Sequence, residues 1–489
     1  MKASPTDLSE LYNINEQGKI QPQHQKGLYL GDGVKLPIQQ NFTRLGGQYL
    51  PDNIRGGHFG CFGTTGAGKT RFMAHLIYQD ILSGGSVVLF DPKGDDSLIA
   101  TVIQSAAESG RLDELMFISP IYPDASVKID PLAYYYIPDE LIHHIVSGIR
   151  SREEFFENIA TNITTVIITG LIAKFLAKGE KPLINLSDVK ERITYKAMLD
   201  FVESLKMLRN NPDIKVRNMI DDALTAVFHI TQYPQDFFSK VSSSLGTVLA
   251  QLTSSTTGQI IGKTYKNAFI KRLEEGKRVI LICNTGSLLA RKTASVIARI
   301  LMSMIQSTLG RVLASGRVFD PPLSIYMDEG HNILYNGIEE MFSKGRAANV
   351  YLHFFTQSMS SMNEVVGENT TQSIMDNINT WIFMHENDER TARFIEDSSP
   401  LVTVWRKVVN TGGGNMSVSS REETERVILK ERVLRLKKRY FYLRREGDYY
   451  KCMVPNVPDP YVKLIFPEVS HQTEVSHQTE SEGEHVEAV

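Results

Sequence analysis

The stretch Gly63-Thr64-Thr65-Gly66-Ala67-Gly68-Lys69-Thr70 decides the fold class. An apolar run precedes it and helix-forming residues follow it. Glycines at these spacings let the backbone wrap until its N–H groups point at phosphates, while Lys69 reaches the β- and γ-phosphates and Thr70 binds Mg²⁺. The pattern predicts a site for ATP and Mg²⁺. Its expected lining residues are Gly63, Thr64, Thr65, Gly66, Ala67, Gly68, Lys69, Thr70 and Arg71.

Short apolar runs recur along the chain between helix-forming stretches. They occupy residues 58–62, 86–90, 115–118, 278–282, 323–327, 350–355 and 380–384. Strands that are apolar on both faces and alternate with helices are typical of a parallel sheet covered on both sides. The sequence therefore predicts an α/β fold with a doubly wound, mainly parallel sheet.

Two acids follow the run at residues 323–327. Asp328 is placed to hold Mg²⁺, and Glu329 is placed to polarise an attacking water molecule. Because a chain turns at the end of a strand, both side chains can approach one nucleotide. We therefore expect hydrolysis as well as binding, although two solvated loop acids would give the same pattern.

Three further residues are candidates for the same site. Gln357, at the tip of the run 350–355, can hydrogen-bond water or the γ-phosphate, or simply cap the strand. Arg346 lies in a turn and is suited to reach a neighbouring subunit's nucleotide as an arginine finger. Asp91 begins the sequence Asp91-Pro92-Lys93-Gly94 at a strand's carboxyl end, where ligands gather, although a turn explains the Pro and Gly equally well.

Composition limits the class of protein. The chain has 489 residues, 53 Lys and Arg, 56 Asp and Glu, and three cysteines that read as core residues without disulfide or metal spacing. We expect an irregular arm at 1–50, a nucleotide-binding domain at 51–184 and 256–467, an inserted all-α domain at 185–255, and a disordered acidic tail at 468–489. No membrane-spanning segment or signal peptide is expected.

The ordered motifs resemble those of the TraG/TraD-type coupling proteins of type IV secretion and conjugation. These motifs are Gly63 to Thr70, Asp91 to Gly94, Asp328-Glu329, Gly345-Arg346, Gln357, and residues 377–380 with 387–392. The resemblance implies a RecA-like, FtsK/HerA-group ATPase that assembles as a ring, expected to be a hexamer. It implies that Lys69, Thr70, Asp328, Glu329 and Gln357 line one subunit's ATP site and that Arg346 completes its neighbour's.

The resemblance also implies partners and a location. The motor would deliver single-stranded DNA with its relaxase, or secreted proteins, into a secretion channel, in contact with channel ATPases and inner-membrane components. Most members begin with two membrane-spanning helices that are not seen here, so we expect a cytoplasmic protein held peripherally at the bacterial inner membrane. Alternatives are a soluble pump for single- or double-stranded DNA, and a nucleotide-gated scaffold.

A basic run with interleaved aromatic residues is the candidate DNA contact. It comprises Arg432, Arg435, Lys437, Lys438, Arg439, Arg444 and Arg445, with Tyr440, Phe441 and Tyr442. Residues 439–453 also read as a β-hairpin that turns at Glu446-Gly447-Asp448. These residues are therefore weak candidates.

Overall fold

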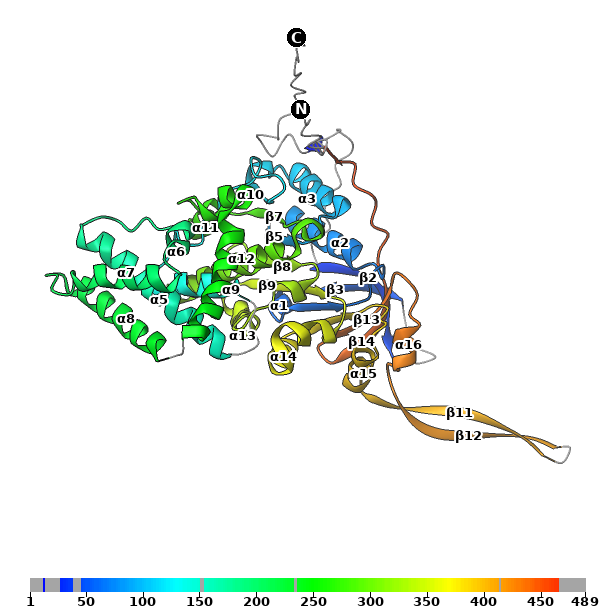
Figure 1. Cartoon of the computed structure of the whole chain (residues 1–489). Coiled ribbons are helices and arrows are strands. Elements are labelled where there is room, and N and C mark those ends of the chain that lie inside the picture. Colours follow the sequence, from blue (N-terminus) through cyan, green and yellow to red (C-terminus); the bar gives the residue numbers. More distant parts are fainter. Residues whose placement is uncertain are drawn as a thin grey trace, which may run out of the picture.

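The computed structural model describes residues 12–13, 27–37, 45–149, 154–232, 235–412 and 415–465. Among these residues, a sheet of 11 strands runs through the molecule in the order β3-β2-β14-β13-β10-β4-β9-β8-β5-β7-β6, with helices on both faces (Figure 1). Two small sheets pair β1 (Tyr12–Asn13) with β15 (Lys463–Leu464), and β11 with β12. The acidic tail at 468–489 lies outside the described residues.

The strands from β10 to β6 in this order are parallel. They are β4 (Phe59–Phe62), β5 (Ser86–Asp91), β6 (Leu115–Ile118), β7 (Ile280–Asn284), β8 (Leu323–Met327), β9 (Val350–Thr356) and β10 (Thr380–Phe383). Each coincides closely with one of the apolar runs. The predicted α/β fold with a mainly parallel, helix-covered sheet is confirmed.

The two faces of the sheet are covered by different helices. Successive strand residues point to opposite sides. On one side Val87 and Leu89 pack with α2 (Lys69–Leu82) and α3 (Asp96–Glu108), and on the other Val88 and Phe90 join the core that includes α12 (Ser287–Ala314). The other helical elements outside the region between β6 and β7 are α1 (Asp52–Arg55), η2 (Leu112–Glu114), η4 (Gly330–Asn332), α13 (Glu339–Lys344), η5 (Gly345–Ala348), α14 (Met359–Asp376), α15 (Glu389–Ser398) and α16 (Lys430–Leu434).

Four antiparallel strands extend the sheet beyond β10. They are β2 (Leu28–Leu36), β3 (Gly46–Leu50), β13 (Tyr440–Arg445) and β14 (Asp448–Met453). The predicted hairpin is present, since Arg445 pairs with Asp448. However, β2 and β3 fall where we expected an irregular arm. Glycines made this segment look irregular, yet Gly33 is needed because a Cβ there would collide with the Cys452 sulfur on β14.

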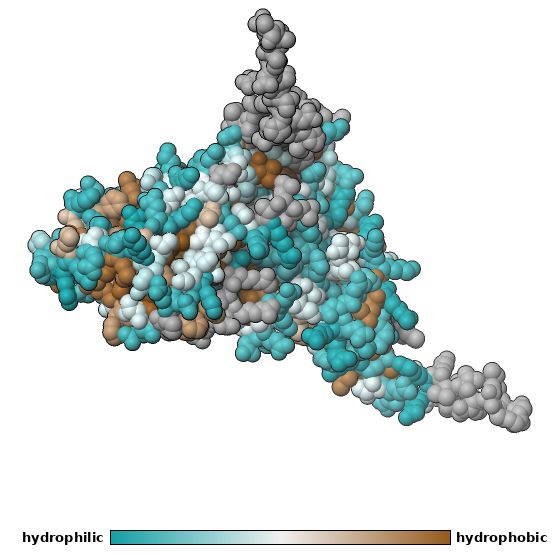
Figure 2. Space-filling model, in the orientation of Figure 1, coloured by the Kyte–Doolittle hydropathy of each residue, from teal (hydrophilic) through white to brown (hydrophobic). Residues whose placement is uncertain are grey.

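A helical region separates β6 from β7. It contains α4 (Pro138–Val146), α5 (Glu154–Ala177), α6 (Leu186–Lys190), α7 (Tyr195–Lys206), α8 (Ile214–Thr231), α9 (Gln235–Thr253), α10 (Ser255–Thr257), η3 (Gly258–Gly262) and α11 (Ala268–Glu274). The predicted boundary at residue 185 leaves α5 outside the insertion, although α5 packs along α8. Figure 2 shows brown, apolar residues gathered over this region.

A two-stranded ribbon projects from the body below α15 (Figure 1). Its strands are β11 (Leu401–Gly412) and β12 (Asn415–Arg426), paired from Leu401 opposite Arg426 to Gly412 opposite Asn415. It was not predicted from the sequence. β11 does contain apolar residues, but its partner β12 is mostly polar and charged, so the pair does not show two apolar runs. Leu401 and Trp405 on β11 are exposed.

Two described helices are long and apolar enough to cross a membrane. They span Phe155–Ala177 in α5 and Arg291–Ala314 in α12. Their most apolar windows are 67% and 78% buried within the protein, respectively. Core helices of folded domains can be equally long and apolar because they are buried in the protein. The two helices are therefore only weak evidence for membrane spans.

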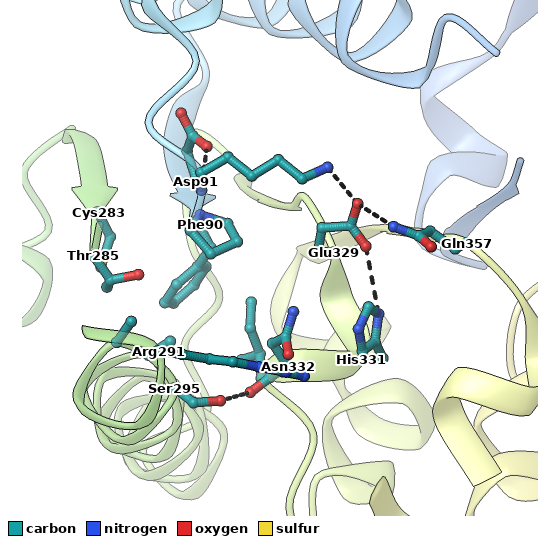
Figure 3. Close-up of a pocket in the computed structure, with 15 residues that line it drawn as sticks. Phe90, Asp91, Cys283, Thr285, Arg291, Ser295, Glu329, His331, Asn332 and Gln357 are labelled. Atoms are coloured by element: carbon teal, nitrogen blue, oxygen red, sulfur yellow. Dashed lines mark hydrogen bonds and ion pairs between the residues drawn. The ribbon is translucent and has the colours of Figure 1, made fainter. Parts of the chain in front are cut away.

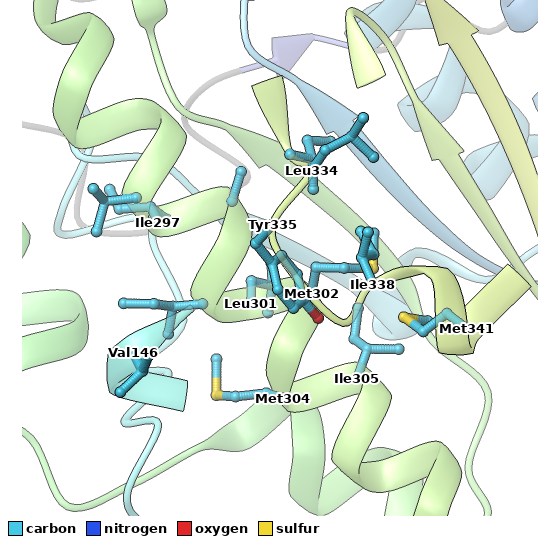
Figure 4. Close-up of a cluster of buried hydrophobic side chains, with 14 of the residues drawn as sticks. Val146, Ile297, Leu301, Met302, Met304, Ile305, Leu334, Tyr335, Ile338 and Met341 are labelled. Atoms are coloured by element: carbon cyan, nitrogen blue, oxygen red, sulfur yellow. The ribbon is translucent and has the colours of Figure 1, made fainter. Parts of the chain in front are cut away.

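Helix α12 links the helical region to the strand that carries the paired acids. Figure 4 shows Ile297, Leu301 and Ile305 of α12 between Val146 of α4 and the segment after β8, which includes Leu334 and Tyr335. All of them are buried. The Ser295 hydroxyl also donates to the Asn332 carbonyl oxygen at 2.6 Å. A shift of the helical region can therefore reach the end of β8 through direct packing.

A buried ion pair joins the elements around the central strands. Arg55 Nη2 lies 2.6 Å from Asp80 Oδ2 and 3.1 Å from Ser324 Oγ, and the Tyr326 hydroxyl donates to the same Asp80 oxygen at 2.6 Å. Burial alone would raise the pKa of Asp80, but the charge and hydrogen bond of Arg55 outweigh it, so its pKa is lowered. The pair ties α1 and α2 to β8.

We expect Asp80→Ala to lower the free energy of unfolding by about 3–5 kcal/mol, because it leaves the Arg55 guanidinium buried without its partner. Urea denaturation measures this. Glu203→Ala, which removes an exposed pair with Lys206, serves as the control and should cost less than about 1 kcal/mol. Equal losses for the two variants would contradict a structural role for the buried pair.

Candidate functional site

The phosphate loop lies between β4 and α2, as predicted. Gly66 and Gly68 have φ values of 80° and 112°, which are left-handed conformations that glycine adopts at little cost. A Cβ at either position would meet no heavy atom within 4 Å, so the loop borders open space. The loop ends at the N-terminus of the 14-residue helix α2, where anions bind favourably. These features fit a phosphate chain.

Lys69 and its neighbours hold the loop in place. Lys69 is buried, and its Nζ donates to the Gly63 carbonyl oxygen and, at 3.3 Å, to that of Thr64. The segment after β10 supports the other side of the loop. The Thr64 N–H donates to the His385 carbonyl oxygen at 2.8 Å, and Asn387 Nδ2 donates to the Thr64 hydroxyl at 3.0 Å. Asn387 belongs to the motif at 387–392.

The paired acids lie directly after β8. Asp328 has no exposed surface, and its Oδ1 accepts the Glu329 N–H at 3.0 Å while Oδ2 has no hydrogen-bond partner. Burial raises the pKa of Asp328, with the Glu329 charge adding to the effect and Lys93 and Lys69 opposing it. A buried carboxylate oxygen without a partner fits a bound cation, and Mg²⁺ is commonly held by one or two carboxylates together with phosphates.

Glu329 is held by polar groups from the segments that follow two other strands, β5 and β9 (Figure 3). Its backbone φ is 47°, and its Oε1 accepts Gln357 Nε2 at 3.0 Å and the Lys93 ammonium. Its Oε2 lies 3.7 Å from His331 Nδ1. Burial would raise the pKa of Glu329, but the hydrogen bonds from Lys93 and Gln357 outweigh it, so its pKa is lowered. The carboxylate is therefore charged at neutral pH.

Asp91 shapes the turn that follows β5. Its carboxylate accepts the N–H groups of Lys93, Gly94 and Asp95 at 3.1, 2.9 and 2.7 Å. Burial and the nearby Asp328 charge raise the pKa of Asp91 to about 7. The side chain that we expected to bind the nucleotide thus lies next to Asp328, with its oxygens engaged by the turn.

A cavity of about 290 Å³ adjoins the paired acids on the β5 side. Its described lining includes Asp91, Lys93, Arg291, Glu329 and His331, from the ends of β5 and β8 and the start of α12 (Figure 3). This lining includes no residue of the phosphate loop. Glu329 lines the cavity, and the charge of Lys69 in the phosphate loop contributes to lowering its pKa.

Two predicted site residues lie apart from the others. Arg71 contacts Asp459 and donates to Ser97 Oγ at 3.0 Å, so its guanidinium is engaged by other parts of the chain. Arg346 is exposed on η5, before the first residue of β9. Gln357 directly follows the other end of that seven-residue strand, roughly 20 Å away at about 3.3 Å per residue. Arg346 thus lies at the amino-terminal ends of the parallel strands, whereas the phosphate loop lies at their carboxyl ends.

The sequence analysis missed Lys93 as a partner of Glu329, and it missed Glu386. Glu386 follows β10, the strand beside β4, and is 1% exposed. Burial raises the pKa of Glu386 to about 9, although the Lys69 charge opposes this. Its Oε1 has no hydrogen-bond partner. Its place at the end of an apolar run, at the same edge as the loop, was the signal in the sequence.

The basic run lines an open groove of about 500 Å³. The groove is formed by Glu431, Arg432, Arg435, Leu436, Lys437, Tyr440, Tyr442 and Lys451. Its lining contains four basic side chains and one acidic side chain, so it favours anions. Two tyrosines could also stack on nucleic-acid bases. It lies on α16 and the β13–β14 hairpin, apart from the site at Glu329.

Glu386 predicts a pH dependence of stability. Its pKa is 4.5 ordinarily and about 9 in the folded protein, so between these values the folded state binds more protons and stability falls as pH rises. Glu386→Gln removes this loss. We expect its free energy of unfolding, relative to wild type, to rise by about 1.4 kcal/mol per pH unit from about pH 5 to 9 in urea titrations. A difference that stays constant with pH would contradict this.

Comparisons with known families match both halves of the site. The family model described as the central domain of the helicase HerA covers residues 51–131, which include the phosphate loop and Asp91. The model described as the TraM recognition site of TraD and TraG covers residues 322–438, which include Asp328, Glu329, Arg346 and Gln357. The two matched segments thus contribute residues to the same site, at the carboxyl ends of the parallel strands.

Relatives and solved structures agree with these models. The type 4 coupling protein DotL of Legionella pneumophila is 40% identical over 58 residues, which span 12% of this chain and 7% of DotL. The conjugative coupling protein TrwBdeltaN70 has the same fold, with a TM-score of 0.60 and 17% identity over 83% of this chain and 87% of that one. The structure of TrwB in complex with ADP and Mg²⁺ matches with a TM-score of 0.60 and 16% identity, over 84% of this chain and 89% of that one. The chain is therefore similar to the TraG/TraD-type coupling proteins in these two segments, and it shares its fold with the coupling protein TrwB.

Proposed function

We propose that this chain is a ring-forming ATPase that couples ATP hydrolysis to substrate delivery in a type IV secretion or conjugation system. One observation carries the proposal. The phosphate loop, Gln357 and the Asp328-Glu329 pair follow the adjacent strands β4, β9 and β8 at one edge of the sheet. This edge is where parallel α/β sheets bind ligands.

The residues divide the work by their chemistry. The loop N–H groups and Lys69 would hold the phosphates, and Thr70 and Asp328 would hold Mg²⁺, which supplies charge neutralisation when bound. Glu329 would accept the proton of the attacking water, with Gln357 fixing its orientation through the 3.0 Å hydrogen bond. Asp91 would act indirectly, by fixing the turn beside Asp328.

Arg346 would act on a neighbouring subunit. The strand β9 separates it from its own phosphate loop, and its side chain is exposed. An exposed arginine at the far edge of the sheet is available to a second copy packed against that edge. A closed ring, as in a hexamer, would give every site such a residue.

The cargo would be single-stranded DNA with its relaxase, or secreted proteins. The helical region exposes large apolar side chains that suit protein recognition, namely Leu183, Met207, Ile214, Phe228 and Phe237. The basic groove on α16 and the β13–β14 hairpin suits a DNA strand. The chain would work at the cytoplasmic face of the bacterial inner membrane, through channel ATPases and membrane components. The TrwB complexes with ADP and Mg²⁺ and with an ATP analogue support the choice of nucleotide.

Glu329→Gln should retain ATP binding but lower kcat by about 10²–10⁴-fold, because the amide cannot accept the proton. Phosphate release and nucleotide titration measure the two effects. Lys69→Ala should lose binding as well, whereas Lys206→Ala on the helical region should change neither. Unchanged turnover in Glu329→Gln would contradict base catalysis at this position. Normal transport with this variant would favour a nucleotide-gated scaffold.

The ATPase rate per chain should rise with protein concentration, and Arg346→Ala should abolish this rise. An arginine finger supplies about 10³–10⁵ in kcat, so the loss should be large in the assembled protein and small in the dilute chain. Lys344→Ala, which removes a nearby exposed cation on α13, is the matched control. A concentration-dependent rate that survives in Arg346→Ala would contradict the finger.

A further inference from the structure

The turn after β5 presents a lysine to the proposed catalytic base. The Asp91 carboxylate fixes this turn by accepting three consecutive backbone N–H groups. Gly94 has a φ of 71° and packs near the Asn284 side chain. The backbone of Lys93 is therefore well anchored, while its side chain extends from β5 to Glu329 at the end of β8.

The contact occupies one oxygen of Glu329. Both Lys93 Nζ and Gln357 Nε2 donate to Oε1. Oε2 is buried without a hydrogen-bond partner. A carboxylate oxygen that already accepts a cation and an amide has little capacity left to accept a proton from water. Oε2 has no partner, but it is buried away from solvent, so neither oxygen is available to water. In this arrangement Glu329 is poorly suited to act as a base.

The two partners differ in their freedom to move. The Glu329 side chain is 4% exposed, and its backbone follows directly on the buried Asp328, whereas the Lys93 side chain is 42% exposed. The cavity of about 290 Å³ is lined by both residues. Lys93 can therefore withdraw into the cavity or solvent while Glu329 stays in place.

We propose that Lys93 is a positioning residue whose ion pair prevents Glu329 from accepting a proton from water, and that hydrolysis requires this ion pair to open. The inference rests on the proposed function, because it assigns Glu329 the role of the base. The turn after β5, a strand adjacent to β8, would thus regulate hydrolysis through Lys93. Whatever draws Lys93 away from Oε1 sets the rate of turnover.

The first test is steady-state ATP hydrolysis by the dilute full-length chain. Lys93→Met should raise kcat several-fold with an unchanged KM for ATP, and Lys93→Arg, which preserves the cation, should remain at the wild-type value. Lys292→Met, at an exposed lysine of α12, is the matched control. A fall in kcat would show that Lys93 assists the chemistry, and an unchanged kcat would show that the pair does not limit turnover. Either result would overturn the proposal.

The second test does not depend on hydrolysis. Lys93→Met leaves a buried carboxylate without its cation, so it should lower Tm more in the wild-type background than in the Glu329→Gln background. Equal losses would contradict the ion pair. If the wild type hydrolyses ATP but Lys93→Met lowers Tm equally in both backgrounds, the control by Lys93 is contradicted and the proposed function is not. A coupled pair in a wild type that hydrolyses no ATP would contradict the proposed function, and with it the role of Lys93.

Discussion

The site depends on the burial of three carboxylates at one edge of the sheet. Asp91, Asp328 and Glu329 are all buried, and they follow or end the neighbouring strands β5 and β8. Burying negative charge is costly unless cations or hydrogen bonds compensate. Here the turn N–H groups donate to Asp91, and Lys93 and Gln357 donate to Oε1 of Glu329. Oδ2 of Asp328 and Oε2 of Glu329 remain without a hydrogen-bond partner. The remaining demand for positive charge is what a metal–nucleotide complex would meet.

Sequence reasoning succeeded where the signal is local. Continuous apolar runs predicted the seven parallel strands, and the glycine spacing predicted the phosphate loop. Because parallel strands end at a common edge, the loop, the acids and Gln357 could be placed together before any coordinates. The roles assigned to these residues stay predictions until they are measured.

The failures have physical causes. Strand β2 pairs with β14, more than 400 residues away in the chain, and its glycines reflect that close approach rather than irregularity. In the ribbon β11–β12 the strand β12 is mostly polar and charged, so only β11 carries a run of apolar residues. The Lys93–Glu329 contact joins side chains 236 residues apart. Glu386 follows an apolar run in the sequence, but its burial near the charge of Lys69 is seen only in the structure. Such contacts depend on tertiary packing that no local pattern encodes.

The proposed chemistry requires a nucleotide to bind at this edge together with a metal held by Asp328. Calorimetric titration of the chain with the ATP analogue ADPNP tests it most directly, in the presence of Mg²⁺ or of a chelator, with wild type and Asp328→Asn. We expect one nucleotide per chain, with an affinity that falls sharply when either Mg²⁺ or the Asp328 carboxylate is removed. Binding that is equally tight in all four conditions, or no binding in any of them, would contradict it.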